Sequence, residues 1–129
     1  MWLNALTDQQ RRTLLGLAHN VVVSDGLLDP NEEFMLDAFK REMDLSPRIE
    51  ADYVELDGIE KIFSTRRSRA IALLNLLRLS YVDGAFEIEE ECVLKEVSRA
   101  FGLPDSEFQL MDNWVRRLMA LEEEARGFM

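Results

Sequence analysis

The stretch "SDGLLDPNEE" (residues 24–33) combines a helix stop with a helix start, and a second copy follows as "VDGAFEIEEE" (residues 82–91). In each copy an Asp-Gly pair, two further residues and a second acidic position precede a Glu-Glu pair. Gly26 can adopt the left-handed conformation that ends a helix, and Asp29-Pro30 suits the N-cap and first position of the next one. The pattern therefore predicts two helix–loop–helix units.

The similarity between the two copies extends well beyond these loops. Shifting the chain by 58 residues places residues 14–47 on residues 72–105 without a gap, and eight of the 34 aligned positions are identical. Unrelated helical segments of ordinary composition would share about two or three. We therefore expect an internal duplication, with residues 1–129 forming a single domain.

Apolar residues recur at helical spacing along the chain, and no segment shows the alternation typical of a strand. The sequence predicts an all-α fold, a compact bundle of about five to seven helices. Thr7 and Gln10 form a capping-box pattern, Ser46-Pro47 resembles another helix start, and Asp105 is the expected cap of the last helix. The expected helical segments are residues 8–23, 30–43, 48–56, 59–63, 66–82 and 87–101 and a last helix from 106 through at least 119, with 66–82 the most buried.

Charge and composition exclude several classes of function. The 129 residues carry a formal net charge of −10, from 15 basic and 25 acidic side chains. This balance argues against nucleic acid and against an anionic membrane surface. A cation or a basic protein partner fits the charge, although solubility alone also explains it. We expect a protein partner, no nucleic acid and no direct membrane insertion.

The inventory of reactive residues is small. Cys92 is the single cysteine and His19 the single histidine, which excludes a disulfide framework, a cysteine-based zinc site and an HExxH motif. The chain has neither a Gly-rich phosphate loop nor an evident nucleophile with its base, so we assign no catalytic and no organic-cofactor-binding residues. The first residues lack the features of a signal peptide, and a cytoplasmic location is expected.

The repeated loop resembles only half of an EF-hand. With Asp25 at loop position 5, the Gly, the apolar residue and the final Glu of a calcium loop match in both copies. Positions 1 and 3 would be Val21 and Val23 in the first copy, and Leu79 and Tyr81 in the second. These side chains cannot supply the oxygen ligands that calcium requires, so an EF-hand is excluded.

Glu32 and Glu90 lie on the apolar stripes of their helices, which leaves two interpretations open. Each Glu can sit at the third helical position and bond back to the N-cap amide, where the helix dipole also favours its charge. Alternatively, Asp25, Glu32, Asp83 and Glu90 converge and hold a divalent metal ion or a basic group, with Glu33 and Glu91 as neighbours. The sequence does not identify the metal.

The segments "VVVSDGLLDPNEEFMLDAFKREMDL" and "LRLSYVDGAFEIEEECVLKEVSRAFGL" resemble the TerB-like family, named after tellurite-resistance protein B. The resemblance covers roughly residues 14–103. It implies a helical bundle built from a duplicated unit, with metal binding suspected at the acidic residues of both Asp-Gly motifs. It also implies a stress-response role beside other cytoplasmic or membrane-attached proteins.

Together, these observations predict a non-enzymatic binding or scaffold protein of a tellurite-resistance-like stress-response system. Two alternatives remain at this stage. One is a metal-assisted hydrolase that uses paired carboxylates, and the other is a purely structural protein-interaction domain.

Overall fold

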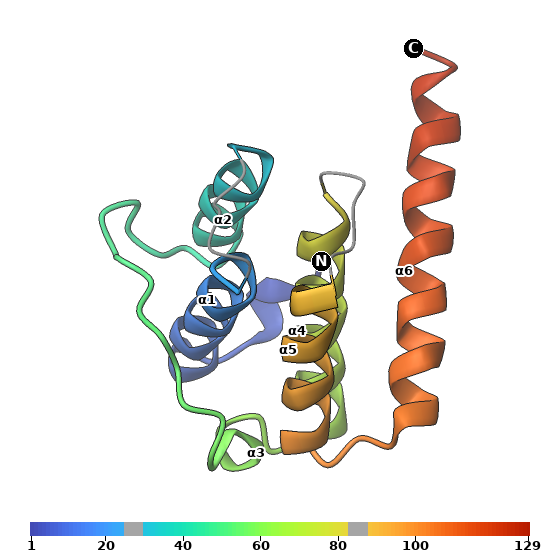
Figure 1. Ribbon diagram of the computed structural model, residues 1–129. Coiled ribbons are helices and arrows are strands. Elements are labelled where there is room, and N and C mark those ends of the chain that lie inside the picture. Colours follow the sequence, from blue (N-terminus) through green and yellow to red (C-terminus); the bar gives the residue numbers. More distant parts are fainter. Residues whose placement is uncertain (25–29, 83–87) are drawn as a thin grey trace.

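The computed structural model describes residues 1–24, 30–82 and 88–129, and the side chain of Glu32 is not among the described parts. The elements are η1 (Leu3–Ala5), α1 (Asp8–Val22), α2 (Pro30–Glu42), α3 (Ile59–Ile62), α4 (Arg66–Tyr81), α5 (Ile88–Ala100) and α6 (Asp105–Arg126) (Figure 1). No strand occurs within these ranges. The predicted all-α bundle of five to seven helices is therefore confirmed.

Helix α4 lies at the centre of the bundle and contacts α1, α2, α5 and α6. Figure 1 shows α1 and α2 on one side of it and α6 on the other. The expectation that this is the most buried helix is wrong, because nine residues are buried in α4 and nine in the slightly shorter α1. Helix α1 reaches the same burial because it is covered by α2, α4 and α5 and also by the connection that follows α2.

Helices α2 and α5, which the sequence repeat aligns with one another, end in the same backbone conformation. Asp44 (φ 56°) and Gly102 (φ 76°) are equivalent positions of the repeat, and both adopt the left-handed conformation. The next amide in each copy donates to a carbonyl five residues back, Leu45 to Lys40 (2.8 Å) and Leu103 to Ser98 (3.0 Å). Both helices therefore end in the same Schellman motif.

Helix starts follow the local signals in two cases and depart from them in a third. The side chain of Thr7 accepts from the amide of Gln10, and Thr65 with Ser68 forms a second capping box. Asp105 is not the N-cap of α6: Pro104 holds that position and Asp105 is the first helical residue. An acidic residue in the first turn still interacts favourably with the helix dipole.

The helix expected after Ser46-Pro47 is absent, because residues 45–58 form an irregular connection with turns at each end. The side-chain amide of Asn20 binds this connection at Val54, donating to its carbonyl (2.7 Å) and accepting from its amide (3.0 Å). One turn earlier, Gly16 leaves room for the connection to pass close to α1. Tertiary bonding to α1 has replaced the local helical preference.

No helix among the described residues is long and apolar enough to cross a membrane.

Candidate acidic site

The four acidic residues of the candidate site are described to different extents. Asp25 and Asp83 lie outside the described residues. Glu32 and Glu90 are the third residues of α2 and α5, which is where one of the two interpretations places each of them. The duplicated motif therefore places one Glu at the same step of each second helix.

Glu90 is buried, with 3% of its surface exposed. Further along the same face of α5, Leu94, Val97 and Phe101 are fully buried and belong to the core. Removing a carboxylate from water is costly unless hydrogen bonds or a positive charge compensate it. The third position of a helix provides part of that compensation, because the helix dipole is positive there.

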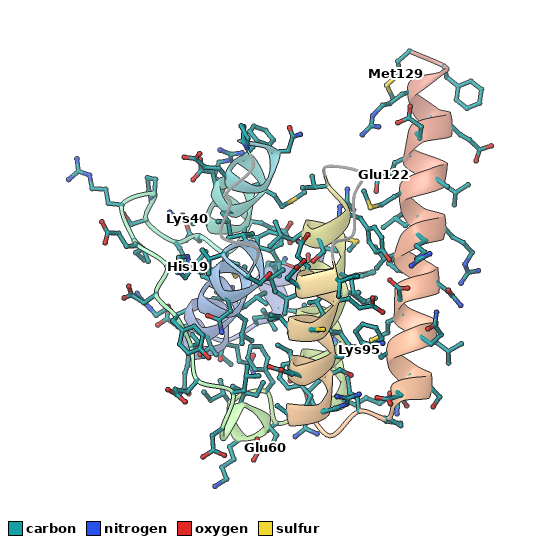
Figure 2. All side chains as sticks on the ribbon, in the orientation of Figure 1. His19, Lys40, Glu60, Lys95, Glu122 and Met129 are labelled. Atoms are coloured by element: carbon teal, nitrogen blue, oxygen red, sulfur yellow. The ribbon has the colours of Figure 1, made fainter. Side chains whose placement is uncertain are left out.

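The two neighbouring residues have different surroundings. Glu33 is exposed and lines a hollow of about 320 Å³ together with His19, Asp37 and Lys40. Figure 2 shows His19 and Lys40 on the side of the bundle formed by α1 and α2. The carboxylate of Glu91 lies 3.2 Å from the ammonium of Lys95, one turn further along α5. Neither residue shares the burial of Glu90.

Among the residues that the structure describes, no group of three or more His, Cys, Asp or Glu side chains is placed to hold a metal ion. Three of the four candidate side chains lie outside that search: Asp25, Glu32 and Asp83. The convergence of the two motifs on a divalent ion therefore stays a prediction. Within the described part, Glu90 is the member that is both acidic and buried.

A polar cluster beside the second motif was not predicted. Tyr81, the last residue of α4, donates its hydroxyl proton to the carboxylate of Asp112 (2.6 Å). Arg116 donates to the Tyr81 oxygen (2.8 Å), lies over its ring, and is 3.1 Å from the Asp112 carboxylate. Burial and the hydrogen bond to Asp112 raise the pKa of Tyr81 to about 12. The phenol is therefore protonated at neutral pH.

The cluster attaches α6 to the end of α4 that leads into the second Asp-Gly motif. Asp112 has 4% of its surface exposed, although it is charged. The sequence did contain a signal, because Asp112 falls between Phe108 and Val115 on the apolar stripe of α6 and precedes Arg116 by one turn. Its partner Tyr81 is 31 residues away, and sequence spacing gives no information about that contact.

Comparisons of the chain with protein-family models, with curated proteins and with solved structures found no match.

Proposed function

We propose that this chain is a non-enzymatic, cytoplasmic binding protein of a stress-response system, and that its duplicated acidic motif holds a divalent cation at a surface that contacts a protein partner. The observation that carries the proposal is the burial of the Glu90 carboxylate at the third position of α5. The repeat places Glu32 at the same position of α2. Both motifs also contain an Asp immediately before Gly, which gives four carboxylates in two equivalent pairs.

Charge and chemistry support binding rather than catalysis. The chain carries ten more negative than positive charges, which favours cations and basic surfaces. The pKa of Tyr81 is raised to about 12, so its phenol stays protonated near pH 7 and cannot act as a base there. The resemblance to tellurite-resistance protein B supports the stress-response assignment and the duplicated acidic site.

Calorimetric titration of the chelator-treated protein with Ca²⁺, Mg²⁺, Mn²⁺ and Zn²⁺ tests the proposal. We expect one of these ions to release or absorb heat on binding and to raise the melting temperature. A ligand present at 100 times its Kd stabilises the folded state by about 2.7 kcal/mol. Absence of both effects for all four ions would refute the cation site.

Two double variants separate cation binding from helix capping. In Glu32→Gln/Glu90→Gln both charges are lost, whereas a capping-box hydrogen bond could still form, because Gln serves as well as Glu at the third helical position. We expect this variant to bind the divalent cation at least tenfold more weakly than the wild type does. The matched control Glu33→Gln/Glu91→Gln removes the same number of charges from the adjacent positions and should bind nearly as the wild type does. Equal affinity of the two variants would argue for capping alone.

A further inference from the structure

Helix α6 carries a second apolar stripe in addition to the one that faces the bundle. Its residues are separated by alternating steps of three and four, which is the heptad spacing of a coiled coil. The members of this seam are Met111, Trp114, Leu118, Leu121 and Ala125 of α6 and Phe128 in the turn that follows it; Met111 and Trp114 are half-buried and also pack against the core. At 3.6 residues per turn, the seam lies roughly a quarter-turn around the helix from the buried face.

The bundle fully buries residues of α6 only in its first half; further along, Met119 packs at the edge of the core and Glu122 is bonded to Arg78 of α4. The buried residues of α6 are Phe108, Asp112 and Val115, and none of the residues after Val115 is buried. Leu121 is 61% exposed and Phe128 is 91% exposed. Figure 1 shows the C-terminal end of α6 extending past the ends of the other helices. Most helical stability in proteins comes from packing an apolar face, and the side chains of Leu121, in this half, and of Phe128, just after it, are left largely uncovered by the described chain.

The exposed surface continues from α6 onto the first residues of the chain. The ring of Trp2 lies 6.2 Å from that of Trp114, tilted by 38°, and Trp2 is 48% exposed. Tryptophan is enriched among the residues that dominate the energy of protein interfaces. The seam and Trp2 together form an apolar surface with aromatic anchors.

We propose that a second copy of this chain binds along the seam, with the two α6 helices antiparallel. In one register, Leu118 of each copy packs against Leu121 of the other. The same register places the largest seam residue, Trp114, opposite the smallest, Ala125, and Met111 opposite Phe128. Facing layers of large and small side chains pack without voids, so the seam is complementary to itself.

Charges beside the seam favour the same arrangement. Arg117 and Glu124 occupy the equivalent flanking position of successive heptads, and both are exposed. No ion pair to another described residue is found for either side chain. In the antiparallel register, Arg117 of each copy faces Glu124 of the other, which gives two identical pairs across the two-fold axis. In a parallel pair Arg117 would instead face Glu122, which is already bonded to Arg78 at 2.7 Å.

The interface is small. Within α6 the seam runs from Met111 to Ala125, which is 15 residues or about 23 Å of helix, and Phe128 lies in the turn that follows. One helix pair of this length, with Trp2 at its side, falls at the low end of specific interfaces, and we expect a dissociation constant of about 1–100 μM. This inference is independent of the proposed cation site.

Sedimentation velocity over a concentration series up to about 500 μM, in about 0.15 M salt, tests the dimer. We expect the wild-type mass to rise from monomer to dimer, and Leu121→Glu to weaken the dimer at least tenfold while far-ultraviolet circular dichroism shows the fold retained. The matched control is Tyr53→Glu, which places the same charge at another exposed site (67%) and should dimerise as the wild type does. A wild-type chain that stays monomeric throughout overturns the proposal and leaves the seam to a different protein.

A charge exchange tests the orientation. Arg117→Glu and Glu124→Arg each replace attraction by repulsion at two places and should weaken the dimer about tenfold. Glu124→Arg is informative because a basic residue near the C-terminus favours the helix itself, so its loss of dimer cannot be ascribed to unfolding. The double variant should restore wild-type association. A double variant as weak as the singles would refute the antiparallel register.

Discussion

Replacing Gly16 by Ala is expected to destabilise this protein, although the same change in the middle of an ordinary helix is stabilising. Gly16 lies within α1 and is buried beneath the connection that follows α2. A Cβ atom at this position would lie 2.1 Å from Cγ2 of Val54 and 2.9 Å from the carbonyl oxygen of Asp52. The side chain of Val54 could turn away, but the Asp52 carbonyl belongs to the backbone, so the connection must move.

Three contributions determine the size of the effect. Ala in place of Gly gains about 1 kcal/mol of helix propensity. Forcing a methyl group into a packed site typically costs about 1–3 kcal/mol. Displacing the connection also weakens the two hydrogen bonds between Asn20 and Val54, each of which contributes about 0.5–1.5 kcal/mol. We expect a net loss of about 1–3 kcal/mol in the free energy of unfolding.

Urea denaturation followed by circular dichroism measures this loss, and a double-mutant cycle with Val54→Ala identifies its cause. Removing Cγ2 of Val54 abolishes the shorter of the two contacts, so Gly16→Ala should be less damaging in that background by about 1 kcal/mol. A Gly16→Ala single variant that is more stable than the wild type by the full helix-propensity gain would refute the close approach of the connection to α1.

Three further outcomes follow from described contacts. Asp44→Gly should raise the free energy of unfolding by about 0.5–1 kcal/mol, because Gly adopts the left-handed conformation of this position without strain. Gly102→Ala should lower the free energy of unfolding by about 1 kcal/mol for the same reason. Urea denaturation of both variants measures these changes. In a Tyr53→Phe background the ultraviolet absorbance of tyrosinate reports Tyr81 alone and should titrate near pH 12. Because the folded-state pKa of Tyr81 exceeds the ordinary value of 10, its contribution to stability is fully present below pH 10 and should be lost as the pH rises from 10 to about 12. A tyrosinate titration with its midpoint near pH 10 would contradict the hydrogen bond of Tyr81 to α6. Asn75→Ala should lower the free energy of unfolding, measured by urea denaturation, by about 2–3 kcal/mol, because its fully buried amide makes three hydrogen bonds. A loss below about 0.5 kcal/mol would show that these hydrogen bonds are dispensable.

The parts of this fold that depend on local sequence were predictable. The capping box at Thr7 was readable because its hydrogen bonds join residues three apart, Thr7 and Gln10. Core stripes were equally readable: of Met35, Leu36, Phe39 and Met43, which share one face by their spacing, the last three are buried and Met35 is half-buried. The helical position of Glu32 followed from the Asp29-Pro30 helix start.

The parts that depend on distant partners were not predictable. The segment after Ser46-Pro47 has a local helix signal, yet its backbone bonds to Asn20, 34 residues away from Val54. Likewise, the sequence around Asp112 is that of an ordinary helix, and its contact with Tyr81 arises only from the packing of α6 on α4. A single sequence contains no information on which of many polar residues will meet across the bundle.

The glycine at position 16 has a counterpart in the second half of the duplication, Leu74, which lies one turn before Arg78 on α4. In the first unit, the chain that returns across this face is irregular backbone held by Asn20. In the second unit, the returning chain is α6, held by the pair of Arg78 and Glu122. Bare backbone can approach a helix where a glycine leaves room, whereas two packed helices keep their axes about 8–10 Å apart and need side chains to fill the space. A glycine therefore leaves room for a loop to cross the first unit, whereas in the second unit Leu74 occupies the equivalent position on a helix that packs against α6.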